Sequence, residues 1–263
     1  MSFGLPLYQK RFFTKVIILT LIIFLCGCVT TEYSVGTHRQ DIFLYSTEKE
    51  VAIGKSLAKE ISHQLEISNN PLYIERLNKI ASKIVEVCDR KEINYYFYVI
   101  DEDKKNALSL PGGYVYVYKG LMDILEDDEL AFVVAHEIAH IVSRHAIKKL
   151  QAAMGANLII LATTRAKTSP NFHEGLSFAL AQVMVAYSRE DEFNADELAA
   201  KYLELAGFDS TVGIDVLDKL YREHKKEPLR EFSYFRTHPY TAQRIRHIKE
   251  FLGIPLDVRD YIN

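Results

Sequence analysis

Residues His136-Glu137-Ile138-Ala139-His140 form an H-E-x-x-H pattern, which restricts the fold and the chemistry of this chain more than any other stretch. On an α-helix, positions four residues apart lie about 40° apart around the axis, so both imidazoles can reach one Zn²⁺. Glu137 is offset by one position, where its carboxylate can hold and deprotonate a metal-bound water. The pattern therefore predicts a catalytic zinc site on a helix.

The residues on both sides of this pattern are apolar on every face of the expected helix. Such a helix belongs in the centre of a domain. Burying two His and a Glu is costly unless a partner compensates, and a bound metal is such a partner. Two histidines satisfied by other core groups are the alternative. We expect this helix to begin at Asp127 and to run through His145.

The third zinc ligand is not part of the same helix. An extended metzincin pattern would need Gly and His at positions 143 and 146, where this chain has Ser143 and Ala146. His145 follows His136 by nine residues, so on a continuous helix it projects from the opposite side. The third ligand is therefore expected from elsewhere in the chain.

The acidic segment 188–196 is the best source of that ligand. On a helix, Glu192 shares a face with apolar residues, whereas Glu190 shares a polar face, so Glu192 is the acid that needs a partner. Asp191 is the second candidate. Asp196, one turn after Glu192, is placed to accept a hydrogen bond from a ligating His. An ordinary charged helix face is the alternative for all of these acids.

The N-terminus differs from the rest of the chain. Lys10, Arg11 and Lys15 precede an unbroken apolar run over residues 16–25, which is typical of a secretory signal peptide. A transmembrane anchor is the alternative, although the run is shorter than the roughly 20 residues that a span needs. The next residues, Leu25-Cys26-Gly27-Cys28, resemble a bacterial lipobox, which implies that Cys28 is lipidated and tethers the protein to a membrane.

The remaining sequence predicts one mainly helical domain with a small β-sheet, an α+β architecture. Residues 93–100 and 114–118 have the aromatic and β-branched composition of strands, with a turn at Pro111-Gly112-Gly113. Thr47 and Glu50 predict a capping box at the start of a helix. The apolar stretches 156–163 and 176–186 are too short to span a bilayer and are expected to be core helices. Further helices are expected at about residues 71–88, 190–205, 211–224 and 241–251.

Four segments together resemble the HtpX and prenyl-protein-protease superfamily of gluzincin zinc metallopeptidases, in its soluble lipoprotein form. They are Asn106-Ala107 with Leu110 to Tyr114 and Gly120-Leu121; His136 to His140 with Arg144-His145; Ser188-Arg189 with Glu192 and Asp196; and Thr237-His238-Pro239 with Arg244-Ile245. The resemblance implies a zincin-like peptidase domain that binds one Zn²⁺ through His136, His140 and Glu192, with Glu137 as general base. The expected organisation is then a signal peptide over 1–27, a lipidated tether over 28–46 and the zinc metallopeptidase domain over 47–263.

Three further features are candidates for the active site. His238 is expected to stabilise the oxyanion or to reach the zinc when substrate is absent; a loop histidine is the alternative. Arg244 is expected to pair with an active-site carboxylate or to stabilise the oxyanion; a surface arginine is the alternative. An edge strand is expected to bind an extended substrate through backbone hydrogen bonds, with a core strand as the alternative. This strand contains Gly113, Tyr114, Val115 and Tyr116.

The sequence thus predicts a zinc endopeptidase that acts on envelope proteins, in quality control of misfolded or misassembled chains. An envelope chaperone or binding module that retains a zinc site is the alternative. Val29 follows Cys28 where an Asp would favour the inner membrane, which by resemblance implies a lipid-anchored protein of the outer membrane facing the periplasm. A formal net charge of -3 without a basic stripe gives no sign of nucleic-acid binding. The expected partners are protein or peptide substrates and, through the lipid, a membrane.

Overall fold

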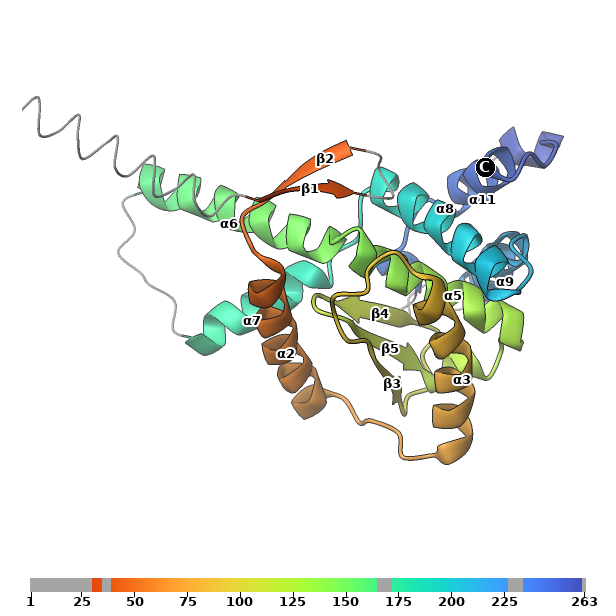
Figure 1. The fold of residues 1–263 in the computed structure, drawn as a ribbon, viewed down its shortest axis with the longest axis horizontal. Coiled ribbons are helices and arrows are strands. Elements are labelled where there is room, and N and C mark those ends of the chain that lie inside the picture. Colours follow the sequence, from red (N-terminus) through yellow and green to blue (C-terminus); the bar gives the residue numbers. More distant parts are fainter. Residues whose placement is uncertain (1–29, 35–38, 165–171, 227–233, 262–263) are drawn as a thin grey trace, which may run out of the picture.

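The computed structural model describes residues 30–34, 39–164, 172–226 and 234–261 (Figure 1). The expected signal peptide and the lipidation site Cys28 lie outside these ranges. Within them the chain is mainly helical, with a three-stranded sheet beside the helix α5 (Asp127–Val142), which carries the H-E-x-x-H pattern. The predicted α+β, mainly α architecture is therefore confirmed.

The three-stranded sheet has β5 (Tyr114–Tyr118) at its centre. β3 (Tyr96–Ile100) pairs with β5 in parallel, and β4 (Ala107–Leu110) pairs with its other side in antiparallel orientation. The expectation that residues 113–116 present an edge strand is therefore wrong, because β5 is hydrogen-bonded on both sides. In this sheet the outer strands are β3 and β4.

The turn between β4 and β5 depends on two glycines. Gly112 and Gly113 have φ values of 75° and 101°, which side chains rarely allow. A Cβ on Gly113 would also lie 2.0 Å from the carbonyl oxygen of Asn94. The turn therefore passes so close to the loop before β3 that a side chain at position 113 would not fit.

Helix α5 is the centre of the domain, as its apolar flanks predict. Every residue from Leu130 to Ile141 is buried. α5 packs against β4 and against three helices, α3 (Pro71–Val87), α8 (Arg189–Ala206) and α9 (Val212–Lys226). α2 (Thr47–Gln64) and α7 (Phe172–Val183) pack on the other face of the sheet (Figure 1). The other elements are β1 (Thr30–Ser34), β2 (Arg39–Phe43), α4 (Lys119–Met122), α6 (His145–Thr164), α10 (Tyr234–Thr237), α11 (Thr241–Phe251) and the 3₁₀ helix η1 (Val258–Tyr261).

The zinc helix is shorter than expected. α5 ends at Val142 instead of running through His145, where α6 begins. Arg144 lies between the two helices with φ of 54°, a left-handed conformation that interrupts the helix and redirects the chain. Its guanidinium donates hydrogen bonds to Glu50 (2.7 Å) and to the carbonyl of Tyr45 (2.6 Å), which hold this turn in place.

The start of α2 also differs from the expected capping box. The N-cap is Ser46, whose hydroxyl accepts a hydrogen bond from the backbone N–H of Lys49. Glu50 is fully buried, and both of its carboxylate oxygens accept hydrogen bonds from Arg90 at 2.9 Å. Glu50 therefore joins α2 to the core instead of capping the helix.

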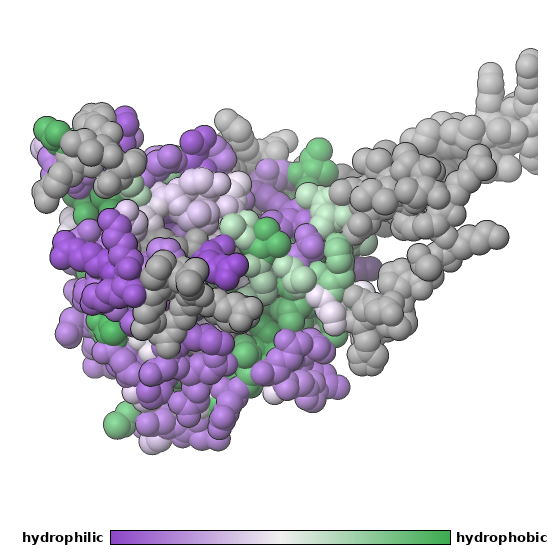
Figure 2. Space-filling view, turned by 180° about the vertical axis from the view of Figure 1, so that it is seen from behind, coloured by the Kyte–Doolittle hydropathy of each residue, from purple (hydrophilic) through white to green (hydrophobic). Residues whose placement is uncertain are grey.

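In the part of the chain that the structure describes, no helix is both long and apolar enough to cross a membrane. Residues 156–163 were expected to pack in the core, but their side chains are not among those that the structure describes. Around α7, Leu180 and Val183 are buried, whereas Phe178 and Val185 are 40% and 52% exposed. Seen from behind, the molecule has a largely hydrophilic surface with apolar residues gathered toward one side (Figure 2).

Candidate metal centre

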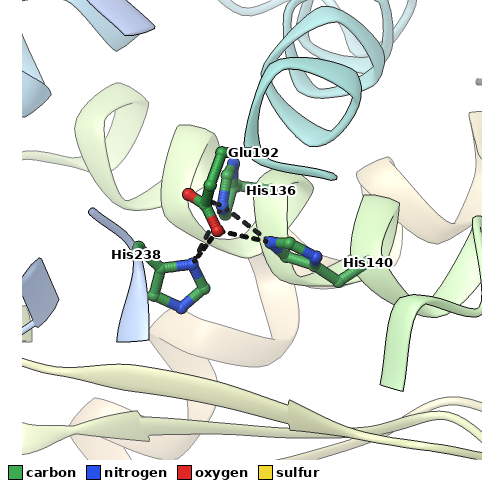
Figure 3. A group of neighbouring side chains, drawn as sticks. All are labelled: His136, His140, Glu192 and His238. Atoms are coloured by element: carbon green, nitrogen blue, oxygen red, sulfur yellow. Dashed lines mark hydrogen bonds and ion pairs between the residues drawn. The ribbon is translucent and has the colours of Figure 1, made fainter. Parts of the chain in front are cut away.

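Four buried side chains from three segments converge on one point (Figure 3). α5 supplies His136 and His140, α8 supplies Glu192, and the segment after α10 supplies His238. One donor atom from each lies within 4.8 Å of the others, and no member is more than 1% exposed. The tertiary fold therefore brings the two expected histidines, the expected glutamate and the loop histidine into a single cluster.

The contacts within this cluster are short. The Nε2 atoms of His136 and His140 are 3.0 Å apart, and each lies 3.5 Å from an oxygen of Glu192. Nδ1 of His238 lies 3.1 Å from Glu192 Oε1 and 3.3 Å from His136 Nε2. Three imidazoles and a carboxylate that face one another in this way are the donor types that zinc binds.

The balance of charge also fits a divalent cation. Three fully buried carboxylates, of Glu137, Glu192 and Asp196, surround this point. Among the described residues, the permanent cation that contacts Glu192 and Asp196 is Arg244, which is fully buried as well. With neutral histidines the group carries an excess of two negative charges, and burying such an excess is costly. Zn²⁺ would neutralise it.

The electrostatics keep the acids ionised despite their burial. Burial alone would raise the pKa of Glu192, but His238 and Arg244 outweigh it and hold that pKa well below its ordinary value. Burial likewise opposes ionisation of Glu137, yet His238, His140 and His136 lower its pKa to about 2. Both carboxylates are therefore available as a metal ligand and as a proton acceptor at neutral pH.

The pKa values of His140 and His238 are shifted in opposite directions. Burial lowers the pKa of His140 to about 4, which keeps its imidazole neutral, as a metal ligand must be. Burial would also lower the pKa of His238, but Glu192 and Glu137 raise it to about 9. Without metal, His238 thus supplies part of the positive charge that the carboxylates require.

Asp196 and Arg244 form the outer layer of the cluster. Asp196 Oδ1 lies 2.9 Å from His136 Nδ1, the position expected for a carboxylate that orients a ligating histidine. Arg244 donates from Nε and Nη2 to Asp196 at 2.8 and 2.6 Å, and its Nη1 lies 2.8 Å from Glu192 Oε2. Of the two expected roles of Arg244, the geometry shows the pairing with carboxylates.

We expect Asp196→Ala to weaken zinc binding or activity by roughly 10–100-fold, because the loss of an outer hydrogen bond frees the ligand ring. Competition with a chromophoric chelator measures the zinc affinity, and circular dichroism checks that the variant is folded. Unchanged affinity together with unchanged turnover would remove Asp196 from the site.

Two residues near Glu137, the expected general base, have no signal in the sequence. Ser109 of β4 donates a hydrogen bond to Glu137 Oε2 at 2.7 Å. Tyr187 stacks on His140, with ring centroids 3.8 Å apart, and interacts with Ser109 through its side chain. Both lie outside the H-E-x-x-H helix, and neither belongs to a residue type that marks a metal site, so only the fold reveals them.

His145 lies outside the four-residue cluster, as expected, but the expectation that it projects from the opposite side of the helix is wrong. Because the helix breaks at Arg144, Nδ1 of His145 lies 2.8 Å from Nδ1 of His140. Asp191, the second candidate for the third ligand, lies outside the four-residue cluster and faces His145 Nε2 at 3.4 Å. A turn signal between residues 142 and 145 would have predicted the position of His145, but no Gly or Pro stands there.

The sequence is similar to those of known proteins. A family model described as Peptidase family M48 matches residues 71–252. The chain is 28% identical over 191 residues to Metalloprotease LoiP of Escherichia coli (strain K12), covering 69% of this chain and 71% of LoiP. It is 29% identical over 203 residues to Mitochondrial metalloendopeptidase OMA1 of Schizosaccharomyces pombe (strain 972 / ATCC 24843), covering 75% of this chain and 58% of OMA1.

A third relative is the Beta-barrel assembly-enhancing protease (BepA) of Escherichia coli (strain K12). The identity is 24% over 212 residues, which cover 76% of this chain and 43% of BepA. The chain thus spans less than two thirds of the length of OMA1 and BepA. These matches confirm the family resemblance that the four sequence segments carry.

Proposed function

Because the chain belongs to peptidase family M48 and is a zinc metalloendopeptidase, we propose that it cleaves misfolded or misassembled proteins of the bacterial cell envelope. The observation that carries the proposal is the buried Glu137 beside the cluster of His136, His140, Glu192 and His238. A metal site that serves only structure needs no general base at its side. One relative is named a beta-barrel assembly-enhancing protease, and this name supports envelope proteins as the substrate class.

In this proposal His136, His140 and Glu192 hold one Zn²⁺ per chain. When bound, zinc supplies Lewis-acid polarisation of the peptide carbonyl and acidifies water for attack. His238 lies close enough to the other three donors to occupy a fourth position while substrate is absent. When substrate binds, His238 would have to leave that position. Its imidazole could then donate a hydrogen bond to the oxyanion.

Glu137 acts as the proton carrier of the reaction. Ser109 donates to its Oε2 and fixes the carboxylate, while Oε1 lies 3.2 Å from His238 Nε2. When His238 moves away, Oε1 becomes free to accept a proton from the attacking water. The same carboxyl group can then deliver that proton to the leaving amine.

The described state of the site is closed. His136, Glu137, His140, Glu192 and His238 are each at most 1% exposed. Tyr187 stacks on His140 and interacts with Ser109, so it contacts both the cluster and the outer strand β4. We propose that an extended substrate binds along β4, in place of the β5 residues suggested by the sequence, once Tyr187 and His238 have moved.

A comparison of cells that carry wild type or Glu137→Gln tests the quality-control role. We expect envelope proteins that accumulate in the variant to disappear, with the appearance of new termini, when wild type is restored. Quantitative proteomics of envelope fractions under folding stress gives the measurement. If the variant supports every phenotype of the wild type, the chaperone or binding-module alternative describes the cellular role better.

We also propose that Cys28 is the lipid-bearing residue and that the protein faces the periplasm from the outer membrane. Cys28→Ala should abolish acyl labelling and leave the chain either uncleaved or released from the membrane fraction, because the lipid is the expected anchor. Metabolic labelling with a palmitate analogue and membrane fractionation measure both effects. Persistent labelling in Cys28→Ala would refute this assignment.

A further inference from the structure

We infer that His145 is a positioning residue for the zinc ligand His140 and that Asp191 in turn orients His145. This inference rests on the proposed role of His140 in zinc binding. Its basis is a chain of contacts that leads outward from the metal point. Nδ1 of His140 lies 2.8 Å from Nδ1 of His145, and Nε2 of His145 lies 3.4 Å from Asp191 Oδ1.

The positions of the protons along this chain follow from the chemistry of imidazole. His140 turns Nε2 toward His136 and Glu192, so a metal would take the lone pair of that atom. A neutral imidazole then carries its proton on Nδ1, which must donate to Nδ1 of His145. His145 accepts on Nδ1 and carries its own proton on Nε2, which lies 3.4 Å from the carboxylate of Asp191 but outside hydrogen-bond geometry in this structure.

The surroundings of His145 favour this neutral, accepting form. Its side chain is fully buried, where a charged imidazole would be costly. A protonated His145 would have no lone pair to offer to His140. Asp191 is held in turn by Ser188, whose hydroxyl lies 2.8 Å from Asp191 Oδ2. The outer end of the chain is therefore anchored to the first turn of α8.

The backbone is shaped to bring His145 to this place. On a continuous helix His145 would project away from His140, and the left-handed Arg144 redirects it. A non-glycine residue in this left-handed conformation is strained, and such strain is retained where surrounding contacts enforce it. Glu50 and the Tyr45 carbonyl are those contacts.

Both expected zinc histidines thus have an outer carboxylate, by two different routes. His136 contacts Asp196 directly at 2.9 Å, and His140 reaches Asp191 through His145. Outer hydrogen bonds fix the tautomer and ring orientation of a ligand, and their loss lowers metal affinity. His145 therefore acts on zinc affinity without touching the metal.

The test compares the full-length protein with His145→Phe and His145→Asn. Phe keeps a ring of similar size but cannot accept a hydrogen bond, whereas the side-chain oxygen of Asn can take the place of Nδ1. We expect His145→Phe to weaken zinc affinity by roughly 10–100-fold and to alter the visible spectrum of the Co²⁺-substituted protein. His145→Asn should restore most of the affinity, and Asp191→Ala should produce a smaller loss than His145→Phe.

A control variant separates positioning from general stability. His247→Phe removes a histidine of α11 that pairs with Glu197 of α8 at 2.7 Å but touches no proposed ligand. This variant should keep the wild-type zinc affinity, measured by chelator competition, whatever its melting temperature. Wild-type affinity in His145→Phe, or equal loss in His145→Phe and His145→Asn, would overturn the inference. If wild type itself binds no zinc, the proposed metal site fails instead.

Discussion

Glu137→Gln is expected to abolish peptide-bond cleavage while zinc remains bound. Gln has nearly the same volume as Glu but cannot accept a proton from water, and loss of general-base catalysis typically costs about 10²–10⁴-fold in rate. The proposed ligands His136, His140 and Glu192 are untouched, and Ser109 can still donate to the amide oxygen. Cleavage of casein or an unfolded envelope protein measures the rate, and elemental analysis measures the zinc.

Two controls bracket this result. Asp128→Asn, on the exposed first turn of the same helix α5, should cleave like wild type. The double variant His136→Ala/His140→Ala should lose both zinc and cleavage. A Glu137→Gln enzyme as fast as wild type would mean that Glu137 is not the general base, and full zinc occupancy in the double variant would refute the ligand assignment.

Arg244→Met should destabilise the zinc-free protein by roughly 3–5 kcal/mol, the cost of leaving a buried charge without its partner. Arg244 contacts both Asp196 and Glu192, and all three side chains are fully buried. Such a loss is a large part of the 5–15 kcal/mol that usually separates folded from unfolded domains. Saturating zinc should recover part of the stability, because the divalent cation takes over the neutralisation. Urea unfolding with and without zinc measures both effects.

The matched control lies on the same helix, α11. Arg246 pairs with Glu250 at 2.8 Å, but the two side chains are 44% and 46% exposed. Arg246→Met should therefore change stability by less than about 1 kcal/mol. If Arg244→Met unfolds at the same urea concentration as wild type, the buried charges are not balanced as the contacts indicate.

The site residues that the sequence predicted are those whose direction depends on the period of a single helix. His136, Glu137 and His140 are related by the period of a single helix, and the apolar flanks of that helix predicted its burial. Glu192 was chosen over Asp191 because it lies on the apolar face of α8, and it does lie in the metal cluster. In both cases a local period translates directly into the direction of a side chain.

The sheet was harder to predict, because strand order depends on pairing between distant segments. The alternation over residues 114–118 indicates a strand but does not tell an edge from a centre. β5 is central because β4 pairs with one of its sides and β3 pairs in parallel with the other. β3 and β5 are separated in sequence by β4, so no turn between them signals that they pair. The outer strand beside Glu137 is consequently β4, which contributes Ser109.

By itself the sequence determined the family, the buried helix that carries the H-E-x-x-H pattern, and Glu192 as the acid that meets its histidines, since helical periodicity and specific motifs are local properties of a chain. Only the tertiary structure decided which groups surround them. His145 reaches His140 because Arg144 adopts a left-handed conformation, and Arg144 is held there by Glu50, 94 residues earlier. Contacts of this range are set by packing around a buried core, where an unpaired charge or donor is costly, and no period along the chain records them.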